Sequence, residues 1–118
     1  MDVIGFDGNT ISLVTSGEYL SVARTNLAVT TINVNGVDYA VFGGGYTVDT
    51  FTDSTVVDVI GFDGNTISLV TSVEYLSVAR YSLTATTINV NGTDYAVFGG
   101  GITKFTSTDI DIITVPII

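Results

Sequence analysis

The sequence predicts an all-β protein, and three features carry this prediction. Thr, Val and Ile together supply 48 of the 118 residues, and side chains branched at Cβ lose rotamer freedom in helices but pack well on pleated sheets. Charged residues make up 13% of the chain, about half the share found in an ordinary globular protein. Residues 2–46 reappear as residues 58–102, with 38 of the 45 aligned positions identical.

The repeat has a period of 56 residues and divides the chain. The seven differing pairs are Gly17/Val73, Thr25/Tyr81, Asn26/Ser82, Ala28/Thr84, Val29/Ala85, Val37/Thr93 and Tyr46/Ile102. Long sequence periods are typical of arrays whose units do not bury their faces alone. We predict a first repeat at 1–57 that starts inside a blade, a second repeat at 58–113, and a C-terminal tail of the closing strand at 114–118.

Each unit contains four short β-segments, which in the second repeat span 55–62, 66–70, 83–90 and 95–98. Turn sequences separate them, because Asp63-Gly64 and Asn91-Gly92 supply the positive φ angles that tight hairpins need. The segment 66–70 alternates polar and apolar residues, as a half-buried strand does. The segment 95–98 is apolar on both faces and is expected in the interior of a sheet. Four strands joined mainly by hairpins predict one propeller blade or one meander of a sandwich.

The repeated segments resemble the kelch repeat. The resemblance rests on an Arg before a strand, a turn Gly, an apolar strand and a Gly-Gly pair: Leu76-Ser77-Val78-Ala79-Arg80, Asn91-Gly92 and Tyr95-Ala96-Val97-Phe98-Gly99-Gly100. The same series recurs from Leu20 to Gly44, and the period is close to the kelch value of about 50 residues. Two family features are missing, the Trp of the outer strand and the Tyr after the double Gly. The resemblance implies antiparallel four-stranded β-propeller blades, two per chain, whereas another propeller or a repeated β-sandwich is the alternative.

The residues shared with the family have structural roles in this prediction. Gly43, Gly44, Gly99 and Gly100 let the backbone pass where a Cβ would clash. Arg24 and Arg80 are expected to be partly buried, donating hydrogen bonds to carbonyl oxygens or to an Asp of a neighbouring blade. Ligand binding is the alternative role for the two arginines.

Two blades do not close a ring, since propellers have about four to eight. By the 56-residue period Asp53 falls on Asp109, so the chain starts and stops inside a blade. We therefore expect a homo-oligomer, with a trimer of six blades favoured and each incomplete blade finished by the next chain. A filament, or a fragment of a longer array, is the alternative.

The composition excludes several chemistries. The chain has no Cys and no His, so it lacks thiolate nucleophiles and the commonest metal ligand and general base. Three basic residues against twelve acidic ones do not form a nucleic-acid footprint, and no apolar run reaches the roughly 20 residues of a membrane span. No enzyme activity, cofactor or metal is predicted.

The acidic residues have structural explanations. Asp7-Gly8-Asn9 and Asp63-Gly64-Asn65 fit hairpin turns better than calcium loops, which need more oxygen ligands. Asp109 and Asp111 are expected on a solvated strand face that deters aggregation. Glu18 and Glu74 each adjoin a Tyr, but two arginines are too few for a sialidase-like site.

The leading functional prediction is a non-enzymatic, self-assembling repeat module that presents a loop face to protein or carbohydrate. The candidate loops are 15–24, 43–48, 71–80 and 99–104. The candidate binding residues in and beside them are Tyr19, Arg24, Tyr75, Arg80 and Tyr81, because Tyr rings stack on sugars and anchor peptides. Packing within the blade is the other role open to these rings. The alternative function is a purely structural or engineered repeat protein with no ligand.

Overall fold

The computed structural model describes residues 2–6, 8–16, 20–62, 64, 67–71 and 76–113. These residues form β-strands joined by turns and contain no helix, which confirms the predicted all-β class. The strands are β1 (Asp2–Phe6), β2 (Ile11–Ser16), β3 (Ala28–Val34), β4 (Val37–Gly43), β5 (Tyr46–Thr47), β6 (Thr52–Asp53), β7 (Val57–Phe62), β8 (Ile67–Thr71), β9 (Thr84–Val90), β10 (Thr93–Gly99) and β11 (Ile110–Ile113). Within the described residues no helix is long and apolar enough to cross a membrane.

The Asn-Gly pairs form the two tightest hairpins, as predicted. Asn35 and Gly36 have φ angles of 52° and 84°, and Asn91 and Gly92 have 51° and 85°. Positive φ at both central residues is the requirement of a type I′ turn, which matches the twist of the flanking strands. The turns therefore set the registers of β3 with β4 and of β9 with β10.

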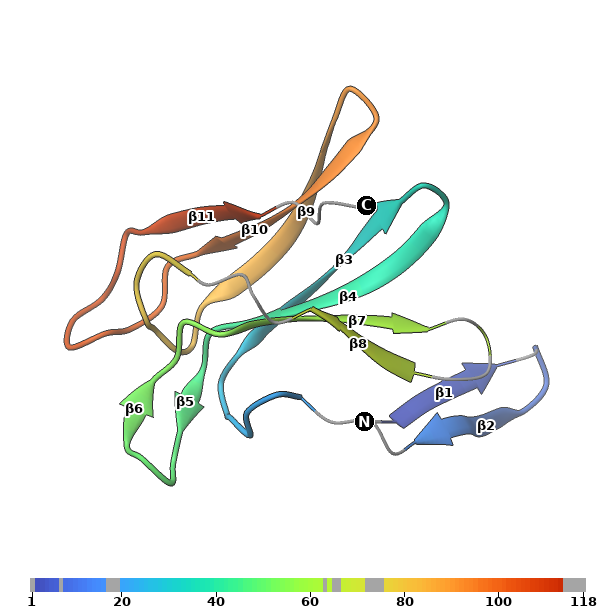
Figure 1. Cartoon of the computed structure of the whole chain (residues 1–118), viewed down its shortest axis with the longest axis horizontal. Coiled ribbons are helices and arrows are strands. Elements are labelled where there is room, and N and C mark those ends of the chain that lie inside the picture. The colour runs from blue at the N-terminus through green and yellow to red at the C-terminus, as the bar shows by residue number, and fades with distance from the viewer. Residues whose placement is uncertain are drawn as a thin grey trace.

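The strands build two main antiparallel sheets (Figure 1). The first sheet has the order β3-β4-β7-β8, and the second has the order β11-β10-β9. The hairpin β5–β6 interrupts the path from β4 to β7 and projects from the first sheet, while β1 and β2 pair with each other as a separate two-stranded sheet (Figure 1). Strand β5 lies within the predicted loop 43–48, and no strand was predicted at the position of β6.

The boundaries between the sheets do not coincide with the boundaries of the sequence repeats. The first sheet joins β3 and β4 of the first repeat to β7 and β8 of the second repeat, and β9 begins the next sheet. Strand β8 therefore ends the first sheet, and β9, the next strand along the chain, belongs to the second. The first sheet thus has four antiparallel strands, whereas the second sheet has three.

Strand β11 lies 53 residues after its counterpart β7. This corrects the alignment of the C-terminal segment, which was based on the 56-residue period. Phe42 lies opposite Asp58 in the first sheet, and Phe98 lies opposite Asp111 in the second. The reason is that the connection at 100–109 is three residues shorter than its counterpart at 44–56. Strand β11 is therefore equivalent to β7, and so is β1 by sequence.

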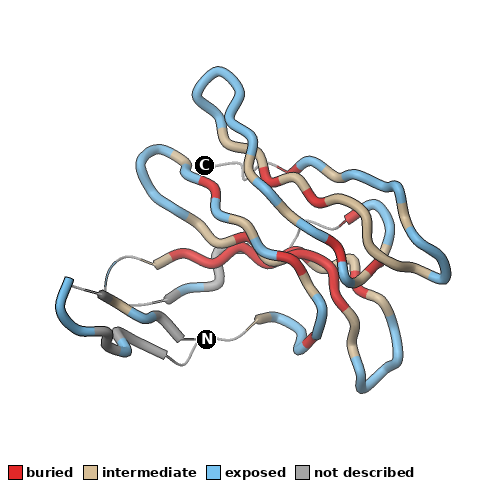
Figure 2. Tube along the Cα trace, turned by 180° about the vertical axis from the view of Figure 1, so that it is seen from behind, coloured by how far each residue is buried: buried red, intermediate tan, exposed pale blue. Residues whose placement is uncertain are grey.

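The hydrophobic core lies where the two sheets meet. We call this contact the junction, and Figure 2 shows the buried residues concentrated along it. The buried apolar residues of the junction are Ala28, Ile32, Val41, Val57, Val59, Leu76, Leu83, Ala96, Phe98 and Ile113. The ring of Phe98 packs on the backbone of Gly43, where a Cβ would lie 2.7 Å from its Cε1 atom. Branched side chains of the first sheet therefore interlock with the second sheet, as in an ordinary close-packed interior.

Polar contacts also cross the junction. The hydroxyls of Thr30 and Thr87 lie 2.7 Å apart, and the backbone N–H of Asn33 donates to a carboxylate oxygen of Asp94 at 2.7 Å. Thr87 also donates to the backbone oxygen of Thr31. Directional bonds of this kind set the relative position of two sheets more narrowly than apolar contact alone.

Candidate functional site

Arg24 lies at the centre of a buried polar cluster in the first sheet. Its Nη1 atom pairs with a carboxylate oxygen of Asp58 at 2.9 Å, and both side chains are fully buried. The guanidinium also donates to four backbone oxygens at 2.7 to 3.4 Å, those of Val22, Phe42, Gly44 and Val56. Ser21 donates to Asp58 through its hydroxyl at 2.7 Å and its backbone N–H at 3.2 Å.

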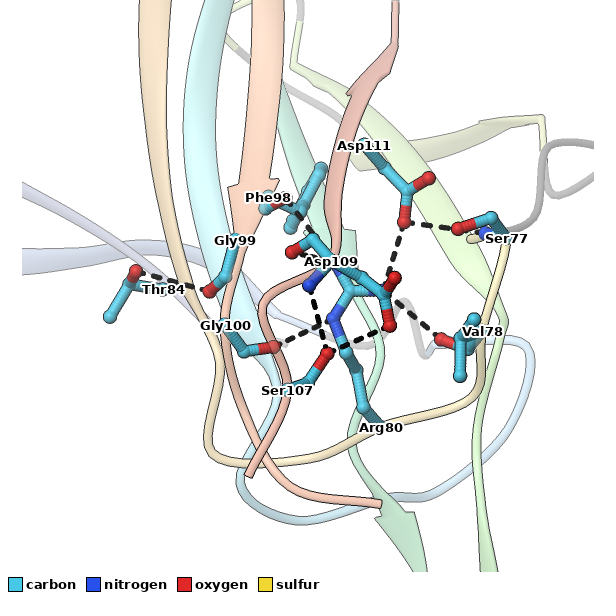
Figure 3. A network of polar contacts seen from close by, with 10 residues as sticks. All are labelled: Ser77, Val78, Arg80, Thr84, Phe98, Gly99, Gly100, Ser107, Asp109 and Asp111. Carbon is cyan, nitrogen blue, oxygen red and sulfur yellow. Dashed lines mark hydrogen bonds and ion pairs between the residues drawn. The ribbon is translucent and has the colours of Figure 1, made fainter. Parts of the chain in front are cut away.

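Arg80 repeats this cluster in the second sheet (Figure 3). Its Nη1 atom pairs with Asp111 at 2.9 Å, and it donates to four backbone oxygens at 2.7 to 3.4 Å, those of Val78, Phe98, Gly100 and Asp109. The backbone of Arg80 belongs to the junction as well, because its oxygen accepts from the N–H of Gly45 at 2.9 Å.

The two arginines have the buried structural role predicted for them, with one correction. Their carboxylate partners belong to the same sheet and not to a neighbouring one, because Asp58 lies in β7 and Asp111 in β11, the strands that pair with β4 and β10. Among the described residues no buried side-chain nitrogen or oxygen lacks a hydrogen-bond partner. The guanidinium groups of Arg24 and Arg80 are therefore already engaged by the protein itself.

Asp111 also corrects a prediction. It was expected on a solvated face, but its side chain is only 15% exposed. Burial is the largest single effect and raises the pKa, but hydrogen bonds from Arg80 and Ser77 and the positive charge of Arg80 together outweigh it, so the pKa of Asp111 lies below its usual value. Asp109 accepts from the hydroxyl of Ser107 at 2.8 Å and remains exposed.

Acid is expected to weaken the fold through Asp111. A carboxyl whose pKa is lower in the folded state than in the unfolded state contributes stability above the unfolded value, about pH 4, and loses it as pH falls through the folded pKa. The free energy of unfolding should therefore decrease below about pH 4. Urea titrations at several pH values test this, with Asp111→Asn as the comparison. An acid dependence as steep in the variant as in the wild type would contradict the prediction.

The predicted tyrosines have different outcomes. Tyr81 lies at the junction, where its ring meets the ring of Tyr46 edge to face with centroids 5.6 Å apart. Its backbone pairs with that of Ile102. Tyr81 therefore packs against Tyr46 of β5, while Tyr19 and Tyr75 lie outside the described residues.

The glycine pairs have unequal surroundings. A Cβ on Gly43 or Gly44 would approach other atoms to within 2.7 or 2.8 Å, so close passage of the backbone is confirmed there. A Cβ on Gly99 or Gly100 would have its nearest neighbour at 3.7 or 3.9 Å. The first pair lies inside the junction, whereas the second pair borders open space.

Two exposed aromatic residues were missed by sequence reasoning. Phe51 and Phe105 are 78% and 79% exposed, and each lies in the connection that follows a triple glycine. Phe51 has a φ of 52°, which costs a non-glycine residue about 1–2 kcal/mol. The signal in the sequence is a Phe between polar residues in each of these two loops.

One face of the second sheet is left uncovered by the residues that the structure describes, and we call it the open face. It is formed by alternate residues of the three strands, of which the most exposed apolar members are Ile88, Val90, Ile110 and Ile112. Two shallow recesses of about 320 and 160 Å³ lie on it. By register this face carries Thr, Val, Ile, Tyr and Gly but no charged residue.

Equivalent residues of the first sheet are buried. Three pairs show the contrast: Ile32 with Ile88, Val57 with Ile110, and Val59 with Ile112. The first members are 0% exposed, whereas the second members are 48 to 67% exposed. The difference arises because the second sheet covers this face of the first sheet, whereas none of the described residues covers the same face of the second.

The described residues contain no group of three or more metal-ligating side chains. Of the two Asp-Gly-Asn segments, Asp7, Asp63 and Asn65 lie outside the described residues, as do Glu18 and Glu74. No protein-family model matches the sequence, and no curated protein matches it.

Proposed function

We propose that this chain is a non-enzymatic repeat module that self-assembles through the open face. The observation that carries the proposal is the contrast between Ile110 and Ile112, each about two-thirds exposed, and their fully buried counterparts Val57 and Val59. The sequence builds the same core-forming surface twice, and the described residues cover it once. Contiguous uncharged apolar surface of this kind marks an interaction site in a soluble protein.

The apolar side chains of the open face supply a driving force for association. Fully burying a Val or Ile side chain contributes about 1.5–3 kcal/mol. Completing the burial of four partly exposed side chains offsets part of the translational and rotational cost of about 4–15 kcal/mol. The net charge of −9 opposes association, because copies repel one another through water. Added salt screens this repulsion and leaves the apolar term in place, so association should tighten as salt rises.

The form of assembly that we propose is a closed ring of kelch-like sheets, with three chains supplying six. The similarity to kelch repeats and the antiparallel four-stranded first sheet support it. The second sheet has three strands, and the strand that it lacks corresponds to β8, whose sequence twin is β2 in the separate β1–β2 sheet. A contact that does not close into a ring would make a filament.

The ring would present its loops to protein or carbohydrate partners. Phe51 and Phe105 support this part of the proposal, because exposed aromatic rings anchor peptides and stack on sugars. The engaged state of Arg24 and Arg80 and the lack of Cys and His in the sequence support a non-enzymatic role.

The test is the mass of the particle in solution. Size exclusion with light scattering should give a discrete particle of about three chain masses, as a six-bladed ring requires. Ile112→Lys should release single chains, since a charge in an apolar interface is not desolvated without a partner. Phe51→Ser, at an even more exposed apolar site outside the open face, is the control and should leave the mass unchanged. A wild-type protein that remains a single chain at millimolar concentration would overturn the proposal.

A further inference from the structure

The junction contains an aromatic ring, that of Phe98, and a glycine on which this ring packs, Gly43, which we call its seat. The ring of Phe98 lies on Gly43, and the lack of a side chain at Gly43 is what admits it, because a Cβ would lie 2.7, 2.9 and 3.1 Å from three atoms of that ring. Phe98 is fully buried as a result.

Each repeat supplies one ring and one seat, so a second pair remains unused. The counterpart of the seat is Gly99, whose nearest neighbour to an added Cβ is Ile110 at 3.7 Å. It borders the recess of about 160 Å³ on the open face, lined by Thr84, Ala85, Thr86, Val97, Gly99 and Ile110. The counterpart of the ring is Phe42, which is only partly buried and faces away from the junction.

The threonines of the junction have unused counterparts as well. Thr30 and Thr87 meet with their hydroxyls 2.7 Å apart. Their repeat equivalents are Thr86 on the open face and Thr31 on the far face of the first sheet, which we define as the side that carries Val29, Thr31 and Phe42. Thr31 and Thr86 are both exposed.

We infer that the occupant of the open face is the far face of a second copy, with Phe42 of that copy seated on Gly99 and its Thr31 beside Thr86. This inference rests on the proposed function and specifies its contact. The relation is heterologous, since one copy offers Gly99 and the next offers Phe42, and so it continues the packing already present within the chain.

The differences between the repeats are concentrated on these surfaces. Five of the seven differing pairs lie at the junction or at its copy-to-copy equivalent: Thr25/Tyr81, Asn26/Ser82, Ala28/Thr84, Val29/Ala85 and Tyr46/Ile102. Within the chain, these differing positions are filled by the small side chains of Ala28 and Ala85 and by the contact between Tyr46 and Tyr81. In the inferred contact between copies, the same positions are filled by Thr84 and Val29, which are larger than the alanines, and by Thr25 and Ile102, which are smaller than the tyrosines. The inferred contact between copies thus has the same backbone arrangement as the junction, but the bulky side chains occupy different positions in it.

Disulfide trapping tests the contact. Because the chain has no Cys, the introduced Cys residues are the only thiols that can react. Thr86→Cys protein is mixed with Thr31→Cys protein and oxidised, and the mixed disulfide should form at least about tenfold faster than with Thr50→Cys, an exposed control, because docking raises the effective concentration of the matched pair. The double variant T30C/T87C should form the same bond within one chain and so verifies that the geometry suits a disulfide.

The outcomes separate this inference from the proposed function. A mixed disulfide between Thr86→Cys and Thr31→Cys supports the inference. A predominant disulfide between two Thr86→Cys chains overturns it, because two open faces would then meet each other. Association of the reduced variants without the mixed disulfide overturns the inference but keeps the proposed function, and a lack of association overturns the proposed function itself.

Discussion

Replacing Gly43 by Ala is expected to destabilise the fold by about 1–3 kcal/mol, the usual cost of overpacking a close-packed core. The new Cβ would lie 2.7 Å from the buried ring of Phe98, and this ring is enclosed between two sheets, so it has no free direction in which to move. Urea unfolding followed by circular dichroism measures the loss.

Gly99→Ala is the matched control, since it changes the same repeat position in the second sheet. Its Cβ would lie 3.7 Å from Ile110, an ordinary contact, so at a concentration where the chains are separate the stability should stay within about 0.5 kcal/mol. Equal losses from the two substitutions would show that Gly43 owes its role to backbone conformation and not to the ring of Phe98.

Replacing Asp58 by Ala is expected to cost about 3–5 kcal/mol, a large share of the stability of a typical domain. The carboxylate and its partner Arg24 are both fully buried, so the substitution leaves a buried guanidinium with no opposite charge. It also removes the acceptor of two hydrogen bonds from Ser21. Urea midpoints of the two proteins give the difference.

Asp38→Ala provides the control for Asp58→Ala. Asp38 is exposed and accepts a hydrogen bond from Asn33 at 2.8 Å, so its removal should cost less than about 1 kcal/mol. A loss of under 1 kcal/mol from Asp58→Ala would mean that water reaches Arg24 when its partner is removed.

The local elements were predictable because their causes are local. Asn35-Gly36 and Asn91-Gly92 form their hairpins from positive φ angles alone, and the four predicted segments of the second repeat match β7, β8, β9 and β10. The β5–β6 hairpin was not predicted, since its two-residue strands carry too short a pattern to distinguish them from a loop.

The partners of the predicted site residues were harder to assign. Arg24 and Arg80 stood out because they are two of only three basic residues. Their carboxylate partners were not identified, because Asp111 falls three positions away from the 56-residue period and a shortened loop between paired strands leaves no mark in composition. Phe51 and Phe105 were missed since exposure of an aromatic side chain depends on what packs over it.

The sequence by itself determined the β class, the repeat, the turns and the lack of Cys and His chemistry. These properties follow from backbone preferences and from which side chains are present. Only the tertiary structure decided which copy of each repeated residue is buried. Ile32 and Ile88 occupy the same repeat position, and one is fully buried while the other is 48% exposed. The physical reason is that burial belongs to a pair of surfaces, and in the described part of the chain the two main sheets share one contact, which buries Ile32 and leaves Ile88 exposed.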